Sequence, residues 1–132
     1  MNTENVTEKA RQVAEAMGKD FGLDFSVESL KKVDTMLHRA RRWKREAKDM
    51  LVEEAGCYVG EVLVRKTGGQ WCIDEKYKES MGTNLVLELP GNITASPFGG
   101  CRKRVEHGES DGVEVWARAV VAMSQQREDA HV

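Results

Sequence analysis

The most strongly charged stretch of the chain runs from His38 to Lys48 and contains six basic residues and one acidic residue. On a helix or a connection between helices, these cations could bind acidic groups of a partner protein. They could also follow a phosphate backbone while Trp43 stacks on a base. The alternative is a solvated helix end, in which the cations balance the helix dipole and Trp43 folds back onto the core. The predicted partner-binding residues are Arg39, Arg41, Arg42, Trp43, Lys44 and Arg45.

The overall charge helps to choose between a protein and a nucleic acid as the partner. A nucleic-acid-binding domain is usually basic as a whole, with a pI above about 9. Here the formal net charge is −2 and the pI is near 6.0. We therefore expect another protein as the partner, and a nucleic-acid-binding module using Arg39–Lys48 is the less favoured alternative.

Two glycines at a predicted helix start form a second candidate site. The backbone N–H groups of Gly99 and Gly100 could approach a phosphate or carboxylate, with Arg102 and Lys103 nearby. The chain contains neither of the phosphate-loop patterns G-x-x-x-x-G-K-[ST] and G-x-G-x-x-G. The glycine pair therefore predicts an anion site without a nucleotide-binding signature.

Glu54, Cys57 and Glu61 share one face of a predicted helix and could hold a metal or act in acid–base chemistry. The set lacks the histidine of the helical Glu-x-x-His motif, and no second helix supplies further ligands. A polar edge beside the core is the favoured interpretation, and we expect no metal or cofactor. Glu61 could instead pair with Lys103 or Arg104.

The three cysteines, Cys57, Cys72 and Cys101, form no CxxC pair. Cys101 lies near a helix start and precedes three basic residues, which could favour its thiolate. It also lies on an inward apolar stripe, where a free cysteine is usually a small core residue. The histidines show no spacing typical of a catalytic triad. A thiol-dependent enzyme of unassigned reaction is therefore a second alternative, and we predict no catalytic residue.

The elements that position these residues follow from apolar spacing, which predicts one α+β domain over residues 1–132. Three N-terminal helices precede a three-stranded antiparallel sheet and two C-terminal helices. Gly18 should end the first helix, with Phe21, Leu23 and Phe25 following in an extended linker. The predicted helices are Thr3–Met17, Ser26 (N-cap) to Ala40, Asp49–Lys66, Ser96-Pro97 to Gly108, and Asp111 (capping box with Glu114) to about Gln126.

The period changes from 3.6 to 2 after Gly69, which predicts strands at Gln70–Glu75, Leu85–Leu89 and Asn92–Ala95. A polar loop, Lys76–Thr83, should separate the first two strands, and Pro90-Gly91 should form a type II turn. Gly56 and Gly60 lie four residues apart inside the third helix, where each costs about 1 kcal/mol relative to alanine. This loss predicts close approach of another element.

Several of these residues occur together in a recognisable pattern. A G-x-Y-x-G-E-V helix, a tryptophan opening the first strand, and Pro-Phe before K-R-x-x-x-G-E resemble a small bacterial domain family of unknown function, over about residues 51–123. The resemblance implies an α+β fold and implies no reaction. The residues that carry it are Gly56, Tyr58, Gly60, Glu61, Val62, Trp71, Pro97, Phe98, Lys103, Arg104, Gly108 and Glu109.

The sequence favours a non-enzymatic interaction or accessory domain. No apolar run approaches the roughly 20 residues of a membrane helix, and no signal-peptide block is present. Three cysteines with one left over suit a reducing compartment, so we expect a cytoplasmic protein. One concrete hypothesis is an immunity- or antitoxin-like protein that occludes another protein. Its interface could use the basic stretch, a sheet edge or the aromatic residues Trp43 and Tyr77.

Overall fold

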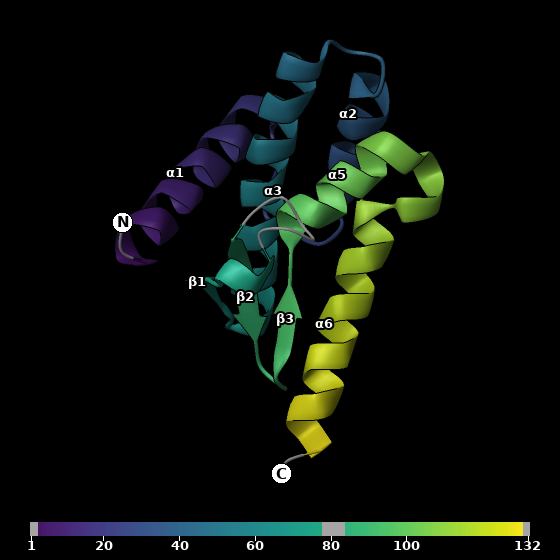
Figure 1. The fold of residues 1–132 in the computed structure, drawn as a ribbon. Helices are drawn as coiled ribbons and strands as arrows, with labels where there is room; N and C mark the ends of the chain where they lie inside the picture. Colours follow the sequence, from purple (N-terminus) through teal and green to yellow (C-terminus); the bar gives the residue numbers. More distant parts are fainter. Residues whose placement is uncertain (1–2, 78–83, 131–132) are drawn as a thin grey trace.

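The computed structural model describes residues 3–77 and 84–130. Three helices precede a three-stranded antiparallel sheet and two follow it, so the predicted α+β class and element order are confirmed (Figure 1). The elements are α1 (Thr3–Phe21), α2 (Leu30–Ala40), α3 (Arg45–Thr67), β1 (Gln70–Ile73), η1 (Glu75–Tyr77), β2 (Leu85–Leu89), β3 (Ile93–Ala95), α5 (Pro97–His107), η2 (Gly108–Asp111) and α6 (Val113–Ala130).

The longest helix, α3, runs through the middle of the molecule. The other four helices and two strands all contact it, with α1 along one side and α5 crossing another (Figure 1). Every residue from Ala55 to Leu63 is buried, so this part of α3 is covered all round. The two ends of α3 lie at opposite ends of the molecule, one at the turn after α2 and the other at the sheet (Figure 1).

The glycine pair of α3 allows the close approach that the sequence predicts. A Cβ atom at Gly56 would lie 2.2 Å from the ring of Phe98, and one at Gly60 would lie 2.1 Å from the ring of Trp71. The two rings have centroids 5.8 Å apart. A side chain at Gly56 would overlap the ring of Phe98 from α5, and one at Gly60 would overlap the ring of Trp71 from β1. Both positions therefore require glycine.

The sheet has the order β1-β2-β3 and one buried face. Trp71 pairs with Leu87 and Leu87 with Ala95, and all three side chains are buried. The predicted turn at Pro90-Gly91 is present, with Gly91 at φ 87°. Asn92 is also left-handed, at φ 58°, so β3 begins at Ile93.

The chain between α1 and α2 differs from the prediction. α1 continues through Gly18 to Phe21, because Gly18 is packed against Phe25 and this packing outweighs its low helix propensity. The predicted extended linker is wrong, since Phe25 has a left-handed φ of 64°. Ser26 accepts a hydrogen bond from the Ser29 amide at 3.1 Å, but it caps a turn, and α2 begins only at Leu30.

The remaining element boundaries shift by a few residues. α3 begins at Arg45, so the last four residues of the basic stretch are in this helix, and β1 ends at Ile73. Ser96 caps α5 as predicted, accepting a hydrogen bond from the Gly99 amide at 3.1 Å. Most of the predicted 76–83 loop and the side chain of Tyr77 lie outside the described residues.

The cap of α6 is also different from the predicted box of Asp111 and Glu114. The amides of Val113 and Glu114 donate to the carboxylate of Asp34 in α2, at 2.7 and 3.0 Å. The N-terminus of α6 is therefore capped by a carboxylate from another helix and not by the local residue that was predicted.

Candidate functional site

The six predicted partner-binding residues lie at the junction of α2 and α3. We call them, together with Lys48, the basic corner: Arg39, Arg41, Arg42, Trp43, Lys44, Arg45 and Lys48. The junction is short, with Arg41–Lys44 between the two helices, and the Trp43 amide donates to Ala40 at 2.9 Å. Ala40 is fully buried and anchors the junction, whereas all four residues after it are exposed.

Trp43 does not fold back onto the core. Its exposed fraction is 48%, and it lies outside the cluster of core side chains. A tryptophan buries up to about 250 Å² in a protein core or interface. The solvated-helix-end interpretation required Trp43 to be covered, and this part of it is wrong.

The cations of the basic corner are largely free of carboxylates. Within residues 3–77 and 84–130, Arg39, Arg41, Arg42, Lys44 and Lys48 form no ion pair. Arg45 approaches Asp49 only at 3.9 Å, and this carboxylate is held more closely by Arg102 of α5, at 2.7 Å. The positive potential of the corner is therefore not neutralised from within the described part of the chain.

The helix dipoles treat the two sides of the corner differently. Arg39 lies in the last turn of α2, where a cation is stabilised by the helix dipole. Lys44, Arg45 and Lys48 lie at the positive end of α3, where the dipole disfavours cations. Only Glu46 is acidic in the first turn of α3. The corner therefore combines side-chain charge with an exposed helix N-terminus of the same sign.

The predicted anion site uses donors that are already engaged. The Gly99 amide donates to the Ser96 hydroxyl, and the Gly100 amide donates to the Ser96 carbonyl at 3.0 Å. Arg102 is directed to Asp49, while Lys103 is exposed. The residues named for this site are thus close in sequence, but their polar groups do not converge on one point.

The face of Glu54, Cys57 and Glu61 is a structural part of α3. Glu61 is 5% exposed, and its carboxylate accepts a hydrogen bond from the indole Nε1 of Trp71 at 3.3 Å. The predicted pairing of Glu61 with Lys103 or Arg104 is wrong, because Glu61 binds the indole of Trp71 and Arg104 pairs with Asp34. Among the described residues, no group of three or more His, Cys, Asp or Glu side chains is placed to hold a metal ion.

The thiols are poorly suited to nucleophilic chemistry. Cys101 is fully buried, and its burial raises the pKa of the thiol. Burial and the neighbouring carboxylates of α3 raise the pKa of Cys57 to about 11. Burial also raises the pKa of Cys72, and Glu88 beside it acts in the same direction. A reactive cysteine needs the opposite shift, because the thiolate is the nucleophile.

Sequence reasoning missed a buried ion pair between α2 and α5. Arg104 is 5% exposed, and its Nε lies 3.3 Å from Oδ1 of Asp34, the same carboxylate that caps α6. Asp34 is 70 residues from Arg104 and about 80 residues from the two amides that it caps in α6. No local pattern signals such a contact, because each residue alone reads as an ordinary surface charge. Asp34 joins three helices.

Comparison with known sequences places the chain in a family. A model described as a family of unknown function (DUF6278) matches residues 6–89, which is more than half of the chain. The chain belongs to this family, and the predicted resemblance to a domain family of unknown function is confirmed. The matched part includes Gly56–Val62 and Trp71 and ends before Pro97. No curated protein and no solved structure matches the chain.

Proposed function

We propose that this member of a family of unknown function is a non-enzymatic interaction domain, and that its basic corner binds an acidic surface of another protein. The observation that carries the proposal is Trp43, a large apolar side chain that is half exposed among cations most of which form no ion pair within the described residues. Covering the exposed half would remove about 100 Å² from water and contribute roughly 2–3 kcal/mol. Tryptophan and arginine are also the residues most enriched at binding hot spots.

The charge distribution supports an acidic protein surface as the target. The basic corner holds six of the 20 Lys and Arg residues within ten positions, in a chain whose formal net charge is −2. Such a patch steers an acidic partner without drawing the whole molecule to polyanions. An immunity- or antitoxin-like role, in which the corner covers an acidic site of a second protein in the cytoplasm, is the concrete version that we propose.

Affinity capture from the native cell, followed by mass spectrometry, tests the proposal. We expect Trp43→Ala to lose at least nine-tenths of a stoichiometric partner, since a buried tryptophan anchor contributes about 2 kcal/mol or more. The matched control is Met123→Ala, which removes a side chain of similar exposure, 44%, from α6. Equal capture by the wild-type and Trp43→Ala proteins would exclude the basic corner as the interface.

The unpaired cations also favour a second candidate, a nucleic-acid-binding module. Mobility-shift assays at two salt concentrations separate it from the first. Counterion release requires tight binding at low salt and a steep loss at higher salt. If no complex with nucleic acid forms at low salt, this second candidate is excluded. A complex that Trp43→Ala weakens would favour it over the protein partner.

A further inference from the structure

A groove of about 550 Å³ lies at the opposite end of α3 from the basic corner. This volume is within the range of small-ligand sites, roughly 300–1,000 Å³. Three segments meet there: the turn before α2, the last turn of α3 and the middle of α6. The lining residues are Asp24, Phe25, Ser26, Val27, Arg65, Lys66, Arg118, Val121, Ala122 and Gln125.

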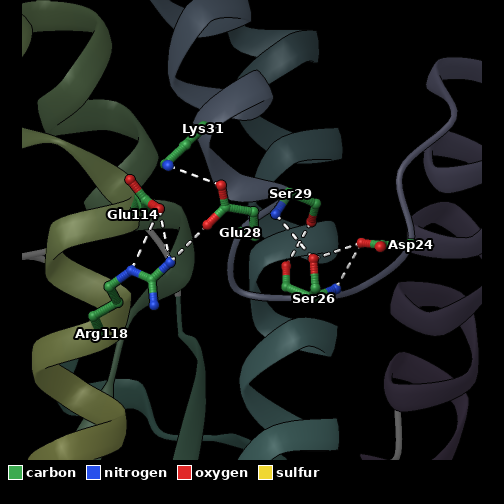
Figure 2. A network of polar contacts seen from close by, with 7 residues as sticks. All are labelled: Asp24, Ser26, Glu28, Ser29, Lys31, Glu114 and Arg118. Carbon is green, nitrogen blue, oxygen red and sulfur yellow. Dashed lines mark hydrogen bonds and ion pairs between the residues drawn. The ribbon is translucent and has the colours of Figure 1, made fainter.

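The groove carries three cations and one carboxylate. The Asp24 carboxylate accepts hydrogen bonds from the amide and the hydroxyl of Ser26, at 3.1 and 2.6 Å, and so is directed to its own turn (Figure 2). Lys66 is exposed and forms no ion pair within the described residues. Both hydrogen bonds to Asp24 come from neutral groups, so Asp24 keeps its negative charge, and the three cations of the lining outnumber its one carboxylate.

Arg65 is positioned by an aromatic ring. Its guanidinium carbon lies 3.6 Å from the centroid of the Phe25 ring. The nearest carboxylate is Glu15, at 3.8 Å, and the Arg65 side chain is 44% exposed. A guanidinium that stacks through its face keeps its in-plane N–H donors available for a carboxylate or phosphate. Phe25 thus holds the face of the Arg65 guanidinium in place and does not use its N–H donors.

Arg118 differs, because its charge is already matched. Its Nη2 lies 3.1 Å from Glu28 and 3.0 Å from Glu114, and its Nε donates to Glu114 (Figure 2). Lys31 binds the other oxygen of Glu28 at 2.8 Å. This network ties α6 to the start of α2 and makes one wall of the groove. Arg65 and Lys66 are therefore the two cationic side chains that can bind an anion in the groove.

Phe25 adds a second, independent observation. It has a left-handed φ of 64°, which costs a bulky residue roughly 1–2 kcal/mol. Its amide donates to the hydroxyl of Tyr58 at 2.8 Å, and the Phe25 and Tyr58 rings have centroids 4.8 Å apart. The Tyr58 hydroxyl also lies 2.6 Å from the hydroxyl of Ser29. Backbone strain that surrounding contacts enforce is a feature of ligand sites.

We propose that this groove binds a small organic anion. Its carboxylate or phosphate would be held by Arg65 and Lys66, and its apolar body would lie against Val27 and Val121, which are both partly buried against the core. A ligand without the anionic group would lose the charge-assisted hydrogen bonds, and one without the apolar body would lose the contact with α6.

Amide-resolved NMR titration of the full chain tests the proposal with benzoate, phenyl phosphate, inorganic phosphate and the neutral benzamide. We expect saturable shifts at Phe25, Lys66 and Val121 with benzoate or phenyl phosphate, and at least about tenfold weaker binding of benzamide and inorganic phosphate. Preference between the two organic anions identifies the ligand headgroup. Lys66→Gln and Arg65→Gln should each weaken binding about tenfold.

The matched control is Arg11→Gln, which removes an exposed arginine of α1 that pairs with Glu8. It should leave binding unchanged. Lys66→Gln keeps the test decisive even if Arg65→Gln loosens the Phe25 turn, because Lys66 makes no such stack. Equal binding of benzoate and benzamide, shifts confined to the basic corner, or unchanged affinity in Lys66→Gln would overturn the proposal.

Discussion

The two ends of α3 both carry basic residues, but for different physical reasons. At the C-terminal end, Arg65 and Lys66 stand where the helix dipole stabilises cations, and Arg65 also stacks on Phe25. At the N-terminal end, Arg45 and Lys48 stand where the dipole disfavours them by about 0.3–1 kcal/mol each. The helix dipole therefore accounts for Arg65 and Lys66 at the groove and does not account for Arg45 and Lys48 at the basic corner.

The comparison also separates two kinds of site. The basic corner is an exposed connection between two helices with a half-exposed aromatic residue, which suits a large partner. The groove is concave and includes the left-handed backbone of Phe25, and its volume suits a small ligand. The dipole of α3 attracts acidic groups to the corner and repels them from the groove, so an anion in the groove must be held by side chains.

The largest effect should come from Gly60→Val, because the new side chain would overlap the Trp71 ring. We expect a loss of about 3 kcal/mol or more in the free energy of unfolding, measured by urea denaturation. The control is Gly100→Ala, whose Cβ would meet Trp116 at an ordinary 3.5 Å. Both sites should fail together in Gly60→Val. Partner capture that survives unfolding would mean that the corner acts as a linear motif.

Asp34→Ala should destabilise the protein by about 3 kcal/mol. The substitution removes the cap of α6 and leaves the buried guanidinium of Arg104 without its carboxylate. Glu28→Ala, which breaks only exposed ion pairs, should destabilise the protein much less than Asp34→Ala does. Because α6 forms a wall of the groove, ligand binding there should weaken more than partner capture at the corner. The opposite order would contradict the separation of the two sites.

Tyr58→Phe should cost about 1–2 kcal/mol, since it removes the acceptor for the Phe25 amide and the partner of Ser29. Thermal unfolding measures this loss. The benzoate affinity of the groove should fall as well, because the left-handed turn loses its support, while capture at the basic corner stays unchanged. If the groove binds equally well in Tyr58→Phe, the Phe25 conformation does not contribute to its ligand affinity.

The smallest effect on stability should come from the double charge reversal Arg41→Glu and Arg42→Glu. Both side chains are exposed and unpaired in the described residues, so the free energy of unfolding should change by less than about 0.5 kcal/mol. Partner capture should be lost, and groove binding should not change. The matched control reverses Lys9 and Lys19 of α1, which are exposed and unpaired in the same part of the chain. Equal loss in both variants would indicate a general charge effect.

Sequence patterns predicted the parts of the fold that depend on neighbouring residues. The N-cap at Ser96, the end of α3 within one residue of Lys66 and the hairpin turn at Gly91 all follow from local backbone chemistry. The glycine pair of α3 predicted a close contact without naming Phe98 or Trp71 as the rings involved. The end of α1 and the start of α3 each lie four residues from the predicted position, and at α1 the packing of Gly18 against Phe25 overrode its low helix propensity.

The candidate sites divide in the same way. The charges of the basic corner are visible in the sequence, but the exposure of Trp43 is not, because an isolated tryptophan can lie either in a core or on a surface. The groove had no sequence signal. Its residues come from three segments more than 35 residues apart, and the left-handed conformation of Phe25 contradicts the alternation from which its strand-like linker was predicted.

The sequence by itself determined the α+β class, the order of the elements and the position of the strongest positive charge, because periodicity, capping and composition act over a few residues. Only the tertiary structure decided which charged side chains are paired with another group of the protein and which are not. Asp34 became a cap and an ion-pair partner, and Glu61 bound Trp71. Arg41 and Arg42 stayed unpaired among the described residues. Such contacts depend on the distance between side chains far apart in the chain, and folding alone sets that distance.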